Sequence, residues 1–349
     1  MNHSQGREDL AGRGPTAKEC TVIVTVFRHA LLRRAYGVLL SIMLLGQISL
    51  AAELSIAVAR TPLSLPIFVA AQQGFFSDQG IHVHLQEVSG GHRALAAVLA
   101  GQVDIGTASD SVLMFNSLKR SDFVTLGYFV SSPSDLSIVA HRDSPQTPDQ
   151  WRGKSVGVVK SASSEYLMHS WLLLNGIDPQ QVNFMDVQPE AMAEALKQRK
   201  VEAVSIWEPT TFALLKQVNG SVVLPSHGLH TLTFHLISTR STATRRAADM
   251  QAVLRAIDQA ETFIRKQPQT AQSILRSTLQ ADQAFIDWIW PRYHYQLGLD
   301  QALISSLESQ ARWSMENGLS NLVEVPNYLN FVDSGPLRTV RHSAVSLIE

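Results

Sequence analysis

The sequence Gly153-Lys-Ser-Val-Gly-Val-Val-Lys160, continued by Ser161-Ala-Ser-Ser164, indicates the class of fold to expect. Residues 155–159 are a short apolar run with β-branched side chains, which predicts a buried strand. Serine is favoured at helix starts, and an apolar stripe over residues 163–174 predicts a helix. A strand that turns through serines into a helix offers hydroxyls, unpaired N–H groups and the positive end of the helix dipole. We interpret this turn as a candidate site for an anion or another polar ligand.

The segment Val201-Glu-Ala-Val-Ser-Ile-Trp-Glu-Pro209 is expected to be a strand whose end carries an aromatic residue, an acid and a helix-breaking proline. In a parallel α/β sheet, this end and the serine turn would both lie at the carboxyl ends of strands, where ligands bind. The two segments together therefore predict a binding cleft, and neither contains a catalytic motif.

Strand and helix patterns alternate along the rest of the chain, which predicts an α/β fold with mainly parallel sheets flanked by helices. Residues 95–105 and 193–203 each pass from a helix through a short turn into valine, an acid and an apolar residue. This internal similarity indicates two lobes of the same kind. Two similar lobes in one chain favour a ligand cleft between them.

The apolar runs 136–140 and 232–238 lie between these units, and we expect them to be two crossover strands that connect the lobes as a hinge. From residue 247 onward the pattern is helical, and its tryptophans are expected to pack in the core. The boundaries we expect are 52–137 with 236–349 for lobe I, and 138–235 for lobe II.

Residues 1–51 are expected to be a leader with a signal peptide. Arg28, Arg33 and Arg34 precede the apolar run 38–45, and small residues at 49 and 51 would form a cleavage site. The apolar run is too short to span a bilayer comfortably, although an uncleaved anchor or a twin-arginine signal is an alternative. The only cysteine, Cys20, lies in this leader, so we expect no disulfide or thiolate chemistry after export.

The formal net charge of the 349 residues is −1, which argues against a protein that binds nucleic acid by neutralising phosphates. His82 and His84 share a strand face, but two ligands are too few for a metal site. We therefore expect no nucleic-acid partner, no metal and no cofactor.

Several segments, in this order over residues 53–340, resemble the extracytoplasmic solute-binding proteins of ABC importers in the sulfonate, taurine, nitrate and thiamine-pyrimidine group. The resemblance implies a two-lobed periplasmic-binding-protein fold of type II. It also implies a monomer in the periplasm that holds a small solute between its lobes and delivers it to the permease membrane subunits. The segments that carry it are Pro66-Ile-Phe-Val-Ala-Ala-Gln-Gln-Gly-Phe-Phe76, Gly80-Ile-His-Val83, Gly90-Gly91, Ala100-Gly-Gln-Val-Asp-Ile-Gly106, Trp151-Arg-Gly-Lys-Ser-Val-Gly-Val158, the 201–209 strand and Pro326-Asn-Tyr-Leu-Asn-Phe-Val-Asp333.

One departure from the family pattern leaves the ligand open. The family often has a glycine at the start of the second-lobe turn, whereas this chain has Lys160-Ser161-Ala162. Serines at helix starts favour an anion, and nearby acids favour an amine, so an aliphatic sulfonate or a taurine-like zwitterion satisfies the pattern. Nitrate and a thiamine-pyrimidine precursor remain alternatives. The candidate ligand-binding residues are Thr61, Gly90, Gly91, Ser109, Asp110, Ser161, Ser163, Ser164, Trp207 and Glu208.

Two functions of other classes are less well supported by the sequence. A pyrimidine synthase of the same fold family needs a cysteine-rich motif, and the chain after its leader has no cysteine. The chain also shows no nucleophile elbow with a Ser-His-acid order. A ligand-sensing domain of a regulator would need a DNA-binding or membrane segment, and neither end carries one. We therefore expect a binding protein and not an enzyme.

Overall fold

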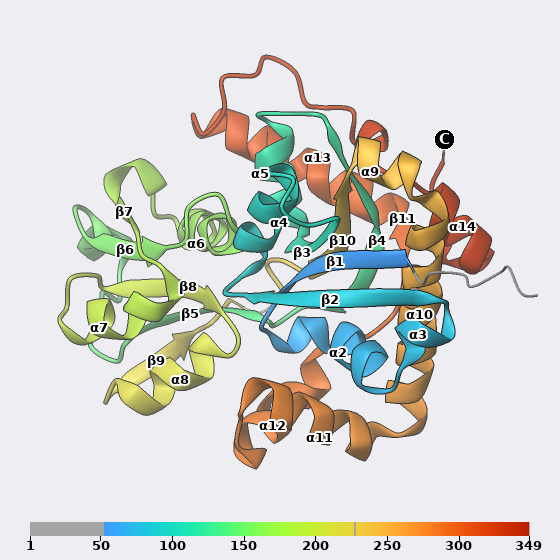
Figure 1. Cartoon of the computed structure of the whole chain (residues 1–349). Coiled ribbons are helices and arrows are strands. Elements are labelled where there is room, and N and C mark those ends of the chain that lie inside the picture. Colours follow the sequence, from blue (N-terminus) through green and yellow to red (C-terminus); the bar gives the residue numbers. More distant parts are fainter. Residues whose placement is uncertain (1–51, 227, 349) are drawn as a thin grey trace, which may run out of the picture. The chain divides into compact units, whose positions relative to one another are not determined.

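The computed structural model describes residues 52–226 and 228–348. The expected signal peptide and Cys20 lie outside these residues. Two five-stranded sheets organise the described chain, with strand orders β2-β1-β3-β10-β4 and β7-β6-β8-β5-β9 (Figure 1). Within the described residues, no helix is both long and apolar enough to cross a membrane.

The two sheets have the same pattern of strand directions. In the first sheet, β1 pairs in parallel with β2 and β3, whereas β10 is antiparallel to β3 and β4. In the second sheet, β6 pairs in parallel with β7 and β8, and β5 is antiparallel to β8 and β9. The predicted α/β fold with mainly parallel sheets is confirmed. The strands of these two sheets are β1 (Ala52–Ala59), β2 (Ile81–Val88), β3 (Ile105–Ser109), β4 (Phe123–Ser132), β5 (Leu136–His141), β6 (Ser155–Val158), β7 (Asn183–Asp186), β8 (Ala203–Trp207), β9 (Ser221–Leu224) and β10 (Leu232–Thr239); β11 (Leu299–Asp300) and β12 (Val345–Ser346) form a separate pair.

The chain passes from the first sheet to the second between β4 and β5, and it returns between β9 and β10. Each crossover strand is also the antiparallel strand inside a sheet, which the sequence reasoning did not foresee. All six residues of β5 are buried, so the strand has no polar alternation that would mark its place in a sheet. β5 pairs within the second sheet from Leu136, and β10 pairs within the first sheet from Leu232.

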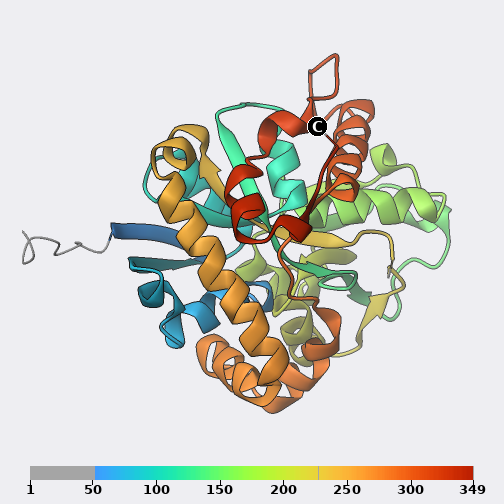
Figure 2. The ribbon, with the colours of Figure 1, turned by 90° about the vertical axis from the view of Figure 1, so that its right-hand side faces the viewer.

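Helices of the first lobe come from both halves of the chain. The long helix α10 contacts α2, α3 and α14, so the C-terminal part of the chain packs against the N-terminal part (Figure 2). The helices of the first lobe are α2 (Leu65–Gln72), α3 (Phe75–Asp78), α4 (Gly91–Leu99), α5 (Asp110–Ser117), α9 (Arg240–Arg245), α10 (Ala247–Lys266), α11 (Pro268–Leu279), α12 (Gln283–Ile289), α13 (Gln301–Glu316) and α14 (Gly335–Val340). The helices of the second lobe are α6 (Ser163–Leu174), α7 (Met192–Lys197) and α8 (Thr210–Gln217).

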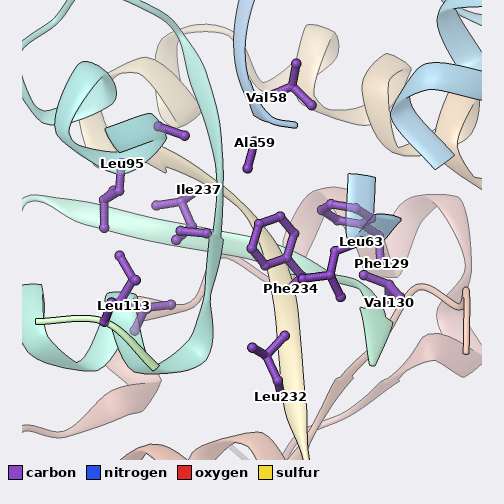
Figure 3. Packing of buried hydrophobic residues seen from close by; sticks show 14 of the residues in the cluster. Val58, Ala59, Leu63, Leu95, Leu113, Phe129, Val130, Leu232, Phe234 and Ile237 are labelled. Carbon is purple, nitrogen blue, oxygen red and sulfur yellow. The ribbon is translucent and has the colours of Figure 1, made fainter. Parts of the chain in front are cut away.

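The core of the first lobe extends to the edge where the site lies. Phe129 on β4 and Phe234 on β10 meet edge to face, with ring centroids 5.9 Å apart. Leu63 and Leu232 lie close by in the same cluster (Figure 3). Burial of this apolar surface provides a large part of the stability of the lobe. It also gives the adjoining cavity an apolar wall that the core holds in place.

Candidate functional site

A cavity lies between the two lobes, at the ends of strands from both sheets. The first sheet and its helices contribute residues of the β1 end, the starts of α4 and α5, and β10. The second contributes the start of α6 and the end of β8. The cavity is small, about 20 Å³, which is room for about one water molecule. Its lining residues are Thr61, Leu63, Gly91, His92, Ser109, Val112, Asp135, Ala162, Ser163, Trp207, Leu232 and Phe234.

Two serines, one from each lobe, are in direct contact at this cavity. The Oγ atoms of Ser109 and Ser163 are 2.6 Å apart, and either hydroxyl can donate. Ser109 is also the N-cap of α5, because its Oγ accepts a hydrogen bond from the N–H of Val112. Both serines are buried. A solute larger than a water molecule must therefore enter with the lobes further apart and displace or extend this serine contact.

Three helices begin at the cavity: α4 at Gly91, α5 at Asp110 and α6 at Ser163. The first N–H groups of a helix have no partner within the helix, and its dipole is positive at that end. Gly91 lets α4 begin directly against β3, because a Cβ atom there would lie 2.8 Å from the Cα of Ala108. Gly90 has a φ of 88°, which favours glycine. The cavity therefore has one wall that suits an anionic group.

Asp135, which the sequence reasoning missed, provides the acid of the cavity. It lies in the β4–β5 crossover and is fully buried. Its Oδ1 accepts a hydrogen bond from the hydroxyl of Tyr293 at 2.7 Å, and its Oδ2 has no partner among the described residues. Burial, and next the charge of Glu208, raise the pKa of Asp135 to about 7. In the sequence this residue follows a Ser-Ser-Pro-Ser turn, and only its position just after a strand end could have drawn attention to it.

The aromatic side of the cavity is formed by Trp207 at the end of β8 and by His92 on α4. Their ring centroids are 6.0 Å apart. Burial lowers the pKa of His92, so its imidazole is neutral at pH 7. Both ring nitrogens of His92 are buried, and the side chain of Gln188 partly opposes the lowering of its pKa.

Five of the ten candidate residues line the cavity, and a sixth lies beside it. Thr61, Gly91, Ser109, Ser163 and Trp207 contribute to the lining. A Cβ atom on Gly90 would approach the rings of His92 and Trp207, so this glycine lies next to the cavity.

The other two serines form the turn itself and do not line the cavity. Ser164 is fully buried, and its hydroxyl accepts from the N–H of Val159 at 2.9 Å and donates to the carbonyl of Val159 at 3.1 Å. Ser161 has a φ of 55°, and its N–H donates to the carboxylate of Glu165 at 2.7 Å. A positive φ is the backbone conformation that glycine adopts most readily. This explains physically why a glycine suits this turn in the resembling family.

The two acids predicted to contact an amine also lie outside the cavity. Glu208 is fully buried and accepts from the indole N–H of Trp288 at 2.8 Å and from the N–H of Phe212 at 3.1 Å. Asp110 is buried as well, and its Oδ2 accepts from the amide of Gln310 at 2.8 Å. Both carboxylates therefore connect helices rather than face the cavity.

Residues 61–271 match the family model described as NMT1/THI5 like. A relative from Escherichia coli (strain K12), named for binding aliphatic sulfonates, is 26% identical over 199 residues, which are 55% of this chain and 61% of that protein. The chain thus spans less than two thirds of that relative's length. The taurine-binding periplasmic protein of the same organism is 22% identical over 244 residues, 68% of each chain.

Solved structures share the fold at lower identity. The alkanesulfonate-binding protein SsuA from Xanthomonas axonopodis pv. citri, bound to MOPS, has a TM-score of 0.71 and 20% identity, covering 81% of this chain and 98% of that chain. The desulfurization enzyme DSZB has a TM-score of 0.61 and 14% identity, covering 84% and 99%. At this identity the likeness shows the fold alone. It confirms the predicted periplasmic-binding-protein fold.

Proposed function

Because the chain belongs to the NMT1/THI5-like family, we propose that it is the solute-binding component of an ABC importer. The observation that carries the proposal is the convergence of three helix starts and a serine pair on one cavity between two lobes. Such a wall favours a small anionic group through N–H donors, hydroxyls and helix dipoles. The solute is an aliphatic sulfonate or a taurine-like zwitterion, the ligand class named for relatives of this chain.

Binding and lobe movement are coupled in this proposal. The solute enters while the lobes are apart, and the anion-binding groups of both lobes then surround it. Ser109 belongs to the first lobe and Ser163 to the second, so a solute oxygen between them would hold the lobes together. The closed form is the one that the permease subunits would recognise.

The groups that face the cavity support binding without catalysis. A serine nucleophile needs a base that accepts its proton, and histidine is the most frequent base. His92 lines the same cavity as Ser109 and Ser163, yet among the described residues no hydrogen bond is found between it and either serine hydroxyl, and the two hydroxyls contact each other. Neither Ser109 nor Ser163 is therefore held against a base in this arrangement, which favours a binding protein over an enzyme such as the structurally similar desulfurization enzyme.

A pyrimidine precursor of thiamine is the second candidate solute. Trp207 and His92 place two ring systems at the cavity, and aromatic rings stack on planar ligands. A thermal-shift screen of the purified protein against sulfonates, taurine, nitrate and pyrimidines distinguishes these candidates, because a ligand of the folded state raises the melting temperature. A rise with a sulfonate supports the proposal. A rise with pyrimidines alone supports the second candidate, and no rise with any of these solutes contradicts both.

Export to the periplasm is part of the same proposal. The leader predicts a mature N-terminus at Ala52 or within a residue or two of it. N-terminal sequencing of a periplasmic fraction measures this directly. Intact residues 28–51 on soluble protein in the cytoplasm would contradict export.

A further inference from the structure

A buried carboxylate oxygen at the cavity has no hydrogen-bond partner. Asp135 has no exposed surface, and Tyr293 satisfies only its Oδ1. Asp135 lines the cavity, and its Oδ2 meets no donor from the described chain. Buried polar atoms are almost always paired, and an unpaired carboxylate oxygen is especially costly. A donor that reaches the cavity is therefore expected to occupy this position.

The charges around Asp135 favour a donor that carries a positive charge. Glu208 is buried nearby, and its charge affects the pKa of Asp135. Arg292 is the cation of this group: its guanidinium lies 3.7 Å from Glu208 and also donates to the carbonyl of Ser134 at 3.3 Å. Two carboxylates thus share one guanidinium. When both are ionised, the group lacks one positive charge, and an unbalanced charge is costly away from water.

Arg292 lies against Trp288 and Glu208. Its guanidinium stacks over the ring of Trp288 at 3.9 Å, and the indole of Trp288 donates to Glu208. The described contacts place the guanidinium beside Glu208, whereas Asp135 Oδ2 has no partner among the described residues.

The other polar wall of the cavity has the opposite preference. Gly91 and Ser163 begin helices there, and Ser109 caps a third, so this wall suits an anion. The lining also includes apolar side chains, among them Leu63 and Phe234. A short molecule with an anion at one end, an apolar link and a cation at the other matches this arrangement.

We propose that Asp135 binds the protonated amine of a small zwitterionic solute whose anionic group lies at the helix starts. This inference rests on the proposed function and narrows it to amine-bearing ligands such as aminosulfonates. It also assigns the amine contact to Asp135. Glu208 then has a structural role, through its contacts with Arg292 and Trp288.

Calorimetric titration of the purified full chain with taurine and ethanesulfonate tests the proposal, because the two probes differ by the amine. The test variant is Asp135→Asn, which keeps an acceptor for Tyr293 but turns an amide toward the ligand amine. Asp300→Asn is a matched control: Asp300 also accepts from a tyrosine hydroxyl, that of Tyr128 at 2.6 Å, and it is the N-cap of α13, a position where asparagine is favoured. Asp300 does not line the cavity.

The wild type should bind taurine roughly tenfold or more tighter than ethanesulfonate, since a hydrogen bond to a charged group is lost with the amine. Asp135→Asn should weaken taurine binding about 10- to 100-fold and change ethanesulfonate binding less than about threefold. Asp300→Asn should leave both affinities as in the wild type. Equal losses for both probes in Asp135→Asn would overturn the role of Asp135 and leave the proposed function standing.

Titration of the wild type with a third sulfonate, isethionate, keeps the proposal testable if Asp135→Asn does not fold. Isethionate replaces the amine of taurine by a neutral hydroxyl, which can still donate to Asp135, so it should bind more weakly than taurine and at least as tightly as ethanesulfonate. Equal affinity for all three sulfonates would overturn the amine contact but support sulfonate binding. No binding of any of the three would overturn both this inference and the sulfonate function.

Discussion

Replacing Ser163 and Ser164 by alanine, one at a time, separates ligand binding from the stability of the serine turn. The two residues are neighbours at the start of α6, yet their hydroxyls have different surroundings. Among the described residues, the Ser163 hydroxyl hydrogen-bonds to the Oγ of Ser109, and Ser163 lines the cavity, whereas the Ser164 hydroxyl bonds both backbone groups of Val159. The same substitution at adjacent positions therefore removes different interactions.

The expected magnitudes follow from those contacts. Ser164→Ala leaves the buried N–H and C=O of Val159 without partners, at about 1–3 kcal/mol each, so unfolding should become easier by roughly 2–6 kcal/mol. Ser163→Ala removes one hydroxyl contact in the free protein, about 0.5–1.5 kcal/mol. Toward an anionic ligand, the Ser163 hydroxyl contributes about 1.5–3 kcal/mol, or about 10- to 100-fold in affinity.

Urea denaturation gives the free energy of unfolding of each variant, and calorimetry gives its affinity for taurine. Ser163→Ala should lose most of the affinity and little stability, and Ser164→Ala should lose stability while its folded fraction binds within about threefold of the wild type. The reasoning is refuted if Ser163→Ala binds taurine as the wild type does. It is also refuted if Ser164→Ala weakens binding as much as Ser163→Ala without loss of stability.

Three other predictions follow from the hinge, from α4 and from Asp135. Small-angle scattering should show a smaller radius of gyration with saturating ligand, since the lobes move about two crossovers; an unchanged radius would contradict the hinge. Gly91→Ala should destabilise the protein by roughly 1–3 kcal/mol, because the added Cβ overlaps Ala108, and melting curves that match the wild type would exclude this overlap. Because the pKa of Asp135 is raised to about 7, the folded protein keeps a proton that the unfolded chain releases near pH 4, so this group's contribution to stability falls as pH rises from about 4 to 7. Asp135→Asn should remove that decrease in urea titrations, and parallel pH profiles of variant and wild type would contradict it. The titratable and charged groups that face Asp135 are Glu208, Arg292, Tyr293 and Tyr295 on its protein side, with His92 across the cavity.

Short-range patterns predicted the strand and helix around the serine turn well. The helix expected over 163–174 is α6, and the strand expected over 155–159 is β6 with one residue fewer. Both depend on neighbouring residues: an apolar run, serines at a helix start and the spacing of apolar side chains. The two-lobed fold followed from the repetition of such patterns and from the family resemblance.

Contacts between distant segments decided what the sequence could not predict. Asp135 follows a turn rich in serine, which suggests an exposed position, but Tyr293, 158 residues away, buries it. The burial of Glu208 could not be predicted for the same reason, because its hydrogen-bond partner Trp288 is 80 residues away in the sequence. A carboxylate at a strand end can thus face a ligand or join two helices, and only the tertiary packing decides which.

A crystal structure of the protein grown with taurine tests the central claim most directly. The ligand should lie between the lobes, with its sulfonate at Gly91 and Ser163 and its amine within hydrogen-bond distance of Asp135 Oδ2. Taurine bound outside this cavity, or bound with its sulfonate beside Asp135, would contradict the claim.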